Sequence, residues 1–383
     1  MKNILFFVES LSGGGAEKVL TTLLRYFDST KYRITLLALV DTGVLRDELD
    51  RKQIRYKAVL RPSSNPLVSF WNKLAYKLIY RYLPSRVMCK GIIPQKDIDL
   101  YVAFTEGFAT KLISFSPGPK IAWVHTDLND NPWTQDKSIF RSIPEEVSAY
   151  LRFNKIVCVS ASVEKSTVRR FGISHTCTIL NPIDASEIRT KAASGVQEII
   201  PGNGFRIVSV GRLVKQKGYD KLIPLIGKLR DKQLDVSLCL IGEGEEFDHL
   251  KRITREHHLN DHVYFFGYQK NPYALMNQMD LFVCSSRSEG YSLVIAEALV
   301  LGLPVISMNC SGPDQLLDGG KYGVLCDDYD DLARTMEQAV TDPWYFNQLR
   351  EKARSRSRYF DIWETVRRVE DLFDETICPP SVS

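Results

Sequence analysis

The 383-residue sequence has no CxxC pair, no apolar run long enough to cross a membrane and no pattern of a secretory leader. Its eight cysteines are scattered, several of them inside apolar runs, which predicts buried, reduced thiols and gives no indication of a zinc site. A membrane span needs roughly 18 uninterrupted apolar residues, and a leader needs a longer apolar stretch and a cleavage site. We therefore expect a cytoplasmic protein, either free or peripheral on the inner face of the cell membrane.

Neither disorder nor a fibrous fold fits the composition, because 44% of the residues are hydrophobic and 25% are charged. The charge is unevenly distributed. Residues 1–185 carry 26 Lys and Arg against 17 Asp and Glu, whereas residues 186–383 carry 24 against 29. The first half is therefore basic and suits an anionic partner, such as a nucleic acid or the headgroups of a membrane. Of these two partners we expect the membrane surface and no nucleic acid.

Short apolar runs rich in Val, Ile and Leu alternate with longer helical patterns, which predicts parallel strands covered by helices on both faces. The rhythm stops at 194–203, where Gly and Pro indicate a linker, and then begins again. The length fits two domains, so the predicted fold class is α/β with two Rossmann-like, doubly wound units. The predicted strands are 4–8, 33–40, 100–104, 120–124, 155–160 and 178–180 in the first half, and 205–210, 236–241, 263–266, 281–284, 304–307 and 323–325 in the second.

A run of three glycines, Gly13 to Gly15, lies between the first strand and the first helix. Glycines at this place let the backbone amides of a helix N-terminus approach an anion closely. The GxGxxG spacing of a dinucleotide site is absent. Asp41 ends the second strand, where such a site places a ribose-binding acid, but without the glycine fingerprint we interpret it as a turn residue. A tight turn would also explain the glycines.

A cationic turn, GRLVKQKG, follows the strand 205–210 directly. The end of a strand in an open α/β sheet faces the ligand crevice, and Arg212 and Lys217 there can neutralise a diphosphate. An isolated basic turn is more often simply solvated. An Arg directly after a strand-ending glycine, Gly211, favours the binding interpretation.

The segment from Ser285 to Ala298 gives the strongest signal. Glu289 lies in the loop at the start of a helix, and the backbone amides of Gly290, Tyr291, Ser292 and Leu293 are placed to meet a phosphate. Glu297 lies about two turns into a helix that is apolar nearly all round, where a charge is costly unless it is paired or liganded. Both acids can instead be ordinary helix residues, but the apolar surroundings favour a function.

His125 follows the strand 120–124. A single histidine after an apolar strand is more often structural than catalytic, and its place at a strand end makes the two interpretations about equally good.

Glu289 and Glu297 form an E-x7-E pair within SEGYSLVIAEALVLGLPVI. Together with VGRLVKQKG, the SGGGAEKV loop and the WVH sequence ending at His125, this segment resembles the signature of family-4 retaining glycosyltransferases, the glycosyl transferases group 1. The resemblance spans nearly the whole chain. It implies the GT-B fold, in which two Rossmann-like domains face each other across a cleft, with an acceptor domain at 1–190 and a donor domain at 200–355. The last segment, 356–383, would carry a helix that crosses back to the N-terminal domain.

The resemblance also implies roles for the candidate residues. Arg212 and Lys217 would bind the donor diphosphate and stabilise the leaving group. Glu297 would hold the ribose, Glu289 would lie at the transferred sugar, and His125 would touch that sugar from the N-terminal domain. No metal and no cofactor is expected. The expected catalytic set is His125, Arg212, Lys217 and Glu289, and the expected donor-binding set is Gly14, Gly15, Arg212, Lys217, Glu289, Gly290, Tyr291, Ser292, Leu293 and Glu297.

One turn departs from the family pattern. The family commonly has a Gly-x-x-Glu turn after the helix, and here Gly312 is followed by Gln315 at the position of the Glu. Either Asp314 takes over the role or the role is lost.

The stretch 61–96 contains seven cations and no acid, interleaved with Trp, Tyr, Phe and Leu at helical spacing. This pattern is typical of a helix at the surface of an anionic membrane, although a helix packed on the domain with a solvated basic face would look similar. A membrane helix fits an acceptor with a lipid tail, such as a polyprenyl-linked saccharide. The residues assigned to the membrane or the acceptor are Trp71, Lys73, Lys77 and Arg81.

The sequence therefore predicts a retaining glycosyltransferase that moves a hexosyl or N-acetylhexosaminyl group from a nucleotide-sugar, with UDP the expected carrier, to a glycan or lipid-linked saccharide of the cell surface. A nucleotide-sugar epimerase of the same fold is the main alternative, and the basic, aromatic stretch argues against it. An NAD-dependent oxidoreductase is opposed by the contiguous glycines. A carbohydrate-binding protein of the two-lobed type would normally be exported.

Overall fold

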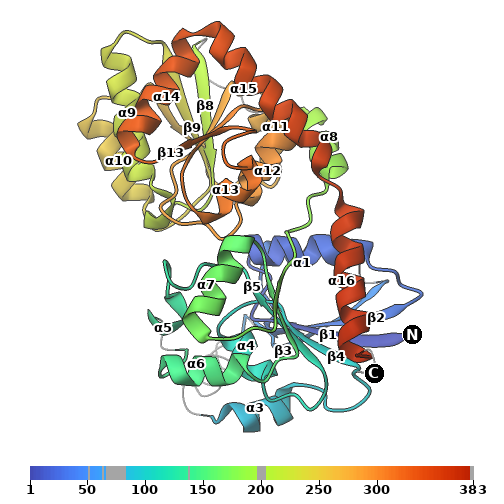
Figure 1. Cartoon of the computed structure of the whole chain (residues 1–383). Coiled ribbons are helices and arrows are strands. Elements are labelled where there is room, and N and C mark those ends of the chain that lie inside the picture. The colour runs from blue at the N-terminus through green and yellow to red at the C-terminus, as the bar shows by residue number, and fades with distance from the viewer. Residues whose placement is uncertain (51, 63, 66–82, 137–138, 196–203, 380–383) are drawn as a thin grey trace. The chain divides into compact units, whose positions relative to one another are not determined.

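The computed structural model places the strands in two parallel sheets, each in its own α/β unit (Figure 1). Unit 1 comprises Met1–Pro182 and Trp363–Ser383, and unit 2 comprises Ile183–Ile362. The predicted α/β class with two Rossmann-like units is confirmed. The residues that the structure describes are 1–50, 52–62, 64–65, 83–136, 139–195 and 204–379.

The sheet of unit 1 has seven strands in the order β3-β2-β1-β4-β5-β6-β7, all of them parallel. Residues 4–8 of β1 are fully buried, as expected of a central strand with helices on both faces. The strands are β1 (Lys2–Val8), β2 (Tyr32–Val40), β3 (Ile54–Leu60), β4 (Leu100–Ala103), β5 (Lys120–Val124), β6 (Lys155–Cys158) and β7 (Thr176–Thr178). The helices are α1 (Gly15–Tyr26), η1 (Val44–Glu48), α3 (Ser85–Ile92), α4 (Phe108–Ile113), α5 (Trp133–Asp136), α6 (Ile143–Tyr150), α7 (Ala161–Phe171) and α16 (Ile362–Ile377).

The sheet of unit 2 repeats this plan with six parallel strands in the order β10-β9-β8-β11-β12-β13. The strands are β8 (Phe205–Val210), β9 (Val236–Ile241), β10 (Val263–Phe265), β11 (Leu281–Cys284), β12 (Val305–Met308) and β13 (Val324–Cys326). The helices are α8 (Ala185–Ala193), η2 (Lys215–Lys217), α9 (Tyr219–Asp231), α10 (Phe247–Glu256), α11 (Pro272–Met276), α12 (Leu293–Val300), α13 (Ser311–Leu317), α14 (Tyr329–Thr341), α15 (Pro343–Arg356) and η3 (Ser357–Tyr359).

The strand order reverses direction between β1 and β4 in unit 1 and between β8 and β11 in unit 2. In open α/β sheets a crevice forms at such a switch point, outside the carboxyl ends of the strands. The loops that leave β1, β4, β8 and β11 are therefore the places where each unit can bind a ligand. Every candidate segment named from the sequence, apart from Asp41, the basic stretch 61–96 and the turn at Gly312, follows one of these strands or β5.

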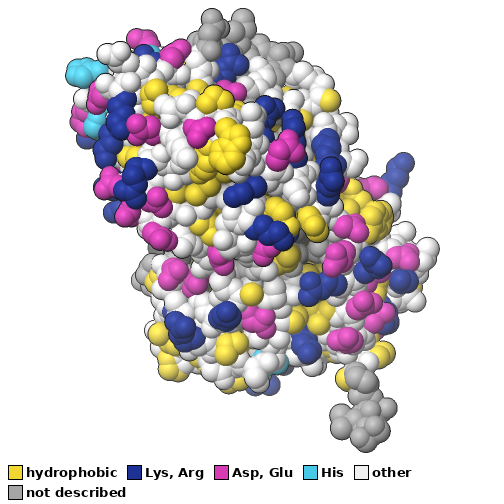
Figure 2. Space-filling view, turned by 45° about the horizontal axis from the view of Figure 1, so that its top comes forward, with side chains coloured by type: hydrophobic (Ala, Val, Ile, Leu, Met, Phe, Trp, Pro, Cys, Tyr) yellow, Lys and Arg dark blue, Asp and Glu magenta, His cyan; other side chains and the backbone are white. Residues whose placement is uncertain are grey.

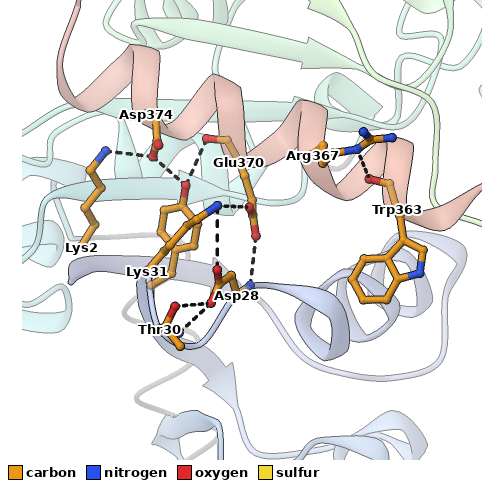
Figure 3. A network of polar contacts seen from close by, with 9 residues as sticks. Lys2, Asp28, Thr30, Lys31, Trp363, Arg367, Glu370 and Asp374 are labelled. Carbon is orange, nitrogen blue, oxygen red and sulfur yellow. Dashed lines mark hydrogen bonds and ion pairs between the residues drawn. The ribbon is translucent and has the colours of Figure 1, made fainter.

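The C-terminal helix α16 packs on unit 1, as the family resemblance implies (Figure 3). The ring of Phe373 is fully buried. The backbone N–H of Asp28 donates to Glu370 Oε1 at 3.0 Å, and the Lys2 ammonium lies 2.9 Å from Asp374 Oδ1. Apolar burial and side-chain pairs thus join the end of the chain to its beginning.

Some elements were not predicted. The edge strand β3 was missed because its side chains are mostly half-buried or exposed and its sequence, IRYKAVL, mixes charges with apolar residues. The helix α8 lies just before the predicted linker, and its residues fall in unit 2, where the Asn271 side-chain amide donates to the Lys191 carbonyl at 2.8 Å. The chain therefore passes from one unit to the other near Pro182.

The basic stretch is only partly described. Trp71, Lys73, Lys77 and Arg81 lie outside the described residues, and α3 is the part that follows them. Arg86, Val87 and Lys90 of α3 are exposed. On the face that Figure 2 displays, Lys and Arg side chains are interspersed with Asp and Glu. Within the described part of the chain, no helix has the length and apolar character needed to span a membrane.

Candidate active site

The switch point of unit 2 brings together the two loops with the strongest sequence signals. β8 and β11 are neighbours in the sheet, so the cationic turn 211–218 and the loop 285–292 leave the same edge side by side. Gly218 has φ +69°, and a Cβ there would lie only 2.0 Å from the carbonyl oxygen of Ser285. Only glycine permits this approach. The glycine that ends the GRLVKQKG motif is therefore required for the contact between the two loops.

Hydrogen bonds fix the two loops to each other. The backbone N–H of Arg287 donates to the carbonyl of Gln216 at 2.8 Å, and the Gln216 side-chain amide donates to the carbonyl of Ser288 at 2.8 Å. The Ser285 hydroxyl donates to the carbonyl of Lys217, also at 2.8 Å. Polar groups of both loops are thus satisfied by the other loop, which makes the pair one rigid surface.

Arg287 adds a charged clasp to this surface. Its guanidinium donates two hydrogen bonds to the carboxylate of Asp220, at 2.9 and 2.8 Å, and a further one to the carbonyl of Lys215. Bidentate pairs of this kind fix geometry more strongly than single contacts. Sequence reasoning included Arg287 in the motif but gave it no role, because its partner Asp220 lies on α9, beyond the cationic turn.

Lys217 and Glu289 form an ion pair between the two loops. Lys217 Nζ lies 2.5 Å from Glu289 Oε1, and the Ser286 hydroxyl donates to the same oxygen at 2.7 Å. The Lys217 and Glu289 side chains are only 20% and 9% exposed. Burial acts to lower the pKa of Lys217, but the attraction of Glu289 and the hydrogen bond to it raise the pKa above its usual value. The lysine is therefore a fixed positive charge at any physiological pH.

Arg212 occupies the residue before the buried Leu213 of the same turn. It is exposed, and among the residues that the structure describes it has no ion-pair partner. A Cβ at the neighbouring Gly211 would lie 3.2 Å from Lys217 Cε, so the lysine side chain passes directly over the residue before Arg212. The structure thus joins Lys217 and Glu289 directly and leaves Arg212 beside them with its charge open to solvent.

The N-terminus of α12 lies at the end of the Glu289 loop and has no side-chain cap. Ser292 occupies the N-cap position, but its hydroxyl makes no bond to the helix, and in the described structure Oγ is buried without a hydrogen-bond partner. The helices α14 and α15 of the same unit are capped by Asp328 and Asp342. An uncapped helix start with an unsatisfied buried hydroxyl is suited to an anionic ligand.

Glu297 is 3% exposed on α12, whose residues 295–300 are all buried. The Tyr273 hydroxyl of α11 donates to Glu297 Oε1 at 3.2 Å. The sequence predicted that such a buried acid must be paired or liganded. The structure gives the carboxylate a partner, Tyr273, that the sequence did not indicate. Tyr273 was not predicted, because the short helix α11 lies outside the motif segments and approaches Glu297 only in the folded chain.

The turn at Gly312 contacts this loop through the backbone. The N–H of Gly312 donates to the carbonyl of Glu289 at 3.0 Å, and a Cβ on Gly312 would lie 3.0 Å from Tyr291 Cα. Asp314 is exposed, and Gln315 is half-buried on the same helix, α13.

In unit 1 the glycine loop lies between β1 and α1, as predicted, and the sheet topology makes this place the switch point. Gly13 has φ +96°, and Gly14 is the N-cap of α1 without a side-chain bond to the helix. Gly15 is the first residue of α1.

Asp41 is held locally. Its Oδ1 accepts from the Tyr56 hydroxyl at 2.9 Å and from Arg46 at 3.3 Å. These contacts agree with the interpretation of Asp41 as a turn residue.

His125 follows β5, and its ring has a defined tautomer. Nε2 lies 2.8 Å from the carbonyl oxygen of Phe104, so Nε2 carries the proton and Nδ1 is the acceptor. Burial lowers the pKa of His125 to about 4, although the Phe104 carbonyl opposes this shift. The imidazole is therefore neutral near pH 7 and presents a lone pair on Nδ1.

Glu106 is a site residue that the sequence reasoning missed. It follows β4 at the switch point, is 3% exposed, and its Oε1 accepts the backbone N–H groups of His125 at 2.6 Å and Thr126 at 2.7 Å. Burial raises the pKa of Glu106 to about 7, and the hydrogen bonds it accepts oppose the shift. An acid two residues after the predicted strand 100–104 was the available signal.

Two parallel α/β units in one chain, each with a glycine loop and an uncapped helix start at its switch point, correspond to the GT-B fold class. Two families divide the chain between them: the "Glycosyl transferases group 1" family matches residues 192–358, and "Glycosyltransferase Family 4" matches residues 13–187. The chain therefore belongs to the family-4 glycosyltransferases.

Curated relatives agree with this assignment. A Campylobacter jejuni enzyme, N-acetylgalactosamine-N,N'-diacetylbacillosaminyl-diphospho-undecaprenol 4-alpha-N-acetylgalactosaminyltransferase, is 28% identical over 94% of this chain and 96% of its own. A lipopolysaccharide core biosynthesis glycosyltransferase of Rhizobium meliloti, LpsE, is 33% identical over 41% of this chain and 44% of its own.

Solved structures show the same fold at lower identity. Anabaena HepE in complex with UDP and glucose superposes with a TM-score of 0.75 at 19% identity, covering 98% of this chain and 100% of its own. A mutant of Staphylococcus aureus TarM, solved with Fondaparinux, alpha-GlcNAc-glycerol and UDP, gives a TM-score of 0.74 at 14% identity, with 98% and 100% covered. These likenesses confirm the GT-B fold.

Proposed function

We propose that this glycosyltransferase moves a sugar from a UDP-sugar, with retention of anomeric configuration, to a glycan or lipid-linked saccharide used in cell-surface polysaccharide assembly. The observation that carries the proposal is the Lys217–Glu289 pair beside the uncapped start of α12, at the switch point of unit 2. A fixed cation and the positive end of a helix at one edge are suited to a diphosphate. The complexes of HepE and TarM with UDP support the choice of nucleotide.

The donor is held by groups of different kinds. The diphosphate lies against Lys217 and the first amides of α12, where the Ser292 hydroxyl provides a further donor. Glu297 binds the ribose hydroxyls while Tyr273 orients its carboxylate. Glu289 lies at the transferred sugar. The backbone around the phosphates comes from Gly290, Tyr291 and Leu293. The backbone that unit 1 contributes to donor binding comes from Gly14 and Gly15.

Cleavage of the anomeric C–O bond builds negative charge on the diphosphate. Lys217 already bears a full charge held in place by Glu289 and by the backbone of both loops, so little reorganisation is needed as the leaving group forms. Arg212, exposed on the same turn, adds a second charge when the donor is bound. These groups together stabilise the transition state more than the ground state.

Retention follows from attack on the same face as the departing phosphate. A double displacement needs a carboxylate nucleophile and a partner acid, whereas the ion pair with Lys217 and the hydrogen bond from Ser286 make the carboxylate of Glu289 a weaker nucleophile. The leaving phosphate itself therefore receives the proton of the acceptor hydroxyl. No metal takes part, because the cations of unit 2 supply the charge that a metal would otherwise provide.

We place the acceptor on unit 1 and the protein on the inner face of the cell membrane. The acid-free stretch 61–96 and the exposed Arg86, Val87 and Lys90 of α3 support this placement. The undecaprenol in the name of the Campylobacter jejuni relative fits an acceptor with a lipid tail. Sedimentation with vesicles of phosphatidylglycerol at low salt tests it: the protein should pellet with them, and a protein that stays in the supernatant would refute it.

The activity itself is tested with a panel of UDP-, GDP- and CMP-linked sugars by scoring release of the nucleotide and the fate of the sugar. We expect release of UDP from one UDP-sugar, faster with lipid-linked saccharide acceptors, and an α-linked product from an α-linked donor. Conversion of the sugar without release of nucleotide would identify an epimerase instead, and an inverted product would refute retention.

A further inference from the structure

Glu106 is the buried acid at the switch point of unit 1, and it holds the turn that follows β5. Its Oε1 accepts two consecutive backbone N–H groups, those of His125 and Thr126, at 2.6 and 2.7 Å. On the other side, His125 Nε2–H donates to the carbonyl of Phe104, which lies two residues before Glu106. The chain just after β4 therefore grips both the backbone and the ring of His125. Three hydrogen bonds fix the direction in which Nδ1 faces.

A carboxylate is a costly way to satisfy two amides. Glu106 is 3% exposed, and within the described part of the chain no ion pair joins it to a cation. Its charge acts on Tyr150 of α6 and Cys158 of β6, and neither of these side chains can carry a positive charge. Burying an unpaired acid destabilises the fold, whereas Glu146 in the same unit is neutralised by Arg170 at 3.4 Å. Stability alone therefore does not account for Glu106.

We propose that Glu106 is a positioning residue for glycosyl transfer, whose ionised carboxylate draws the His125–Thr126 turn into the conformation that presents His125 Nδ1 to the substrate. This inference rests on the proposed function and on the role that the family resemblance implies for His125, which is contact with the transferred sugar. An ionised acceptor binds backbone N–H groups more strongly than a neutral one. The turn is therefore tightest when Glu106 is deprotonated.

This role couples activity to pH in a specific direction. Because the pKa of Glu106 is raised to about 7, the active, ionised form becomes populated as the pH rises through 7. Stability moves the other way: a carboxyl whose folded pKa exceeds its unfolded value contributes stability that is lost as the pH rises through that window. If Glu106 served only to stabilise the fold, its ionisation would change activity in the same direction as it changes stability.

The test compares Glu106→Gln with wild type, using UDP-glucose, UDP-galactose, UDP-N-acetylglucosamine and UDP-N-acetylgalactosamine as probes. Glutamine keeps an acceptor oxygen but not the charge. At pH 8 we expect kcat to fall about tenfold, with KM for the donor little changed. At pH 5.5, where the wild-type Glu106 is protonated, the two proteins should have nearly equal kcat. A ratio that is the same at both pH values would overturn the proposal.

Two further variants separate the possible failures. Glu146→Gln is the matched control, since it alters a buried acid of the same unit, and its activity ratio to wild type should not change between pH 5.5 and 8. His125→Ala reports on the proposed function: if it keeps wild-type turnover, the role of His125 is wrong. If His125→Ala is inactive while Glu106→Gln matches wild type at pH 8, only the inference about Glu106 fails.

A readout without substrate is also available. In ¹⁵N spectra of the histidine rings, His125 should show a protonated Nε2 and a bare Nδ1 in the wild type at pH 8. Glu106→Leu, which leaves both amides without an acceptor, should change these signals, and Glu106→Gln should preserve them in part. Unchanged His125 signals in folded Glu106→Leu would contradict the positioning role.

Discussion

Each unit buries a carboxylate at an equivalent place in its sheet, but the groups that contact the two carboxylates differ. Glu289 follows β11, which lies beside β8, the first strand of unit 2 in chain order. Glu106 follows β4, which lies in the same way beside β1, the first strand of unit 1. Glu289 is met by the side chains of Lys217 and Ser286, whereas Glu106 is met by the backbone amides of His125 and Thr126. The same fold thus produces a fixed ion pair in one unit and a titratable acid in the other.

The difference indicates a division of labour. A permanent cation held by a carboxylate suits a partner whose charge does not vary, such as a diphosphate. In unit 1 the pKa of the acid is raised and the pKa of the histidine is lowered, so both groups can be neutral. Such a site suits hydrogen bonding to hydroxyl groups. This contrast supports our proposal that unit 2 binds the nucleotide and that unit 1 contacts the sugar or the acceptor.

Breaking the ion pair of unit 2 should have the largest effect. Lys217→Gln removes the charge that meets the leaving group, and we expect turnover to fall by about 10²–10³. Because Glu289 is then buried without its cation, the variant should also melt at a lower temperature. The double variant Lys217→Gln/Glu289→Gln should regain thermal stability but not activity.

The control is Lys228→Gln, which disrupts an exposed pair with Asp330 in the same unit and should leave both properties unchanged. Recovery of activity in the double variant would show that Lys217 acts only by neutralising Glu289.

The titratable pair of unit 1 should be visible in the pH dependence of stability. The unfolded pKa of His125 is near 6.5 and its folded value about 4, so its contribution weakens the fold as the pH falls through that window. The folded pKa of Glu106 is about 7 against 4.5 unfolded, so its contribution strengthens the fold over nearly the same window. The two effects, each on the order of 3 kcal/mol, oppose each other.

Removing either group should expose the other. Between pH 7.5 and 5, Glu106→Gln should lose unfolding free energy relative to wild type, and His125→Asn should gain it, as measured by urea denaturation. If both variants keep the wild-type pH dependence, the two groups do not titrate as described.

Loosening the clasp of unit 2 should have a smaller effect. Arg287→Ala and Asp220→Ala each break the bidentate contact that ties α9 to the Glu289 loop, and a double-mutant cycle on kcat should give a coupling of about 1 kcal/mol. Arg230 and Asp235 form an exposed pair in the same unit and provide the matched cycle, for which we expect no coupling. Equal coupling in both cycles would show that the clasp does not serve the site.

Removing the hydrogen bond to Glu297, the second buried acid of the unit 2 site, should have the smallest effect. Tyr273→Phe removes one hydrogen bond from Glu297, which costs about 0.5–1.5 kcal/mol. KM for the nucleotide-sugar should therefore rise severalfold while kcat stays near the wild-type value. A change in kcat alone would mean that Glu297 does not hold the ribose.

The sequence predicted unit 2 better than unit 1 because its signals are local. Glycines, cations and the apolar helix around Glu297 lie within two short segments that each follow one predicted strand. The strand β11, a continuous apolar run, was predicted to the residue, and so was β8, in which apolar residues predominate. The ion pair between Lys217 and Glu289 was not foreseen, since contacts between loops 72 residues apart depend on strand order.

Unit 1 was harder to predict for the same physical reason. Glu106 and His125 are separated by a helix and a strand, and they meet only because β4 and β5 are neighbours. A single acid after a strand is common, and nothing in its immediate sequence indicates burial. Strand β3 failed for another reason, since an edge strand with half-buried side chains lacks the apolar run of a central one.

The position of a bound nucleotide tests the central claim most directly. In crystals of the protein soaked with UDP, we expect the diphosphate to lie within hydrogen-bond distance of Lys217 Nζ and the first amides of α12, with the ribose at Glu297. A diphosphate found away from both Lys217 and the start of α12 would contradict the account.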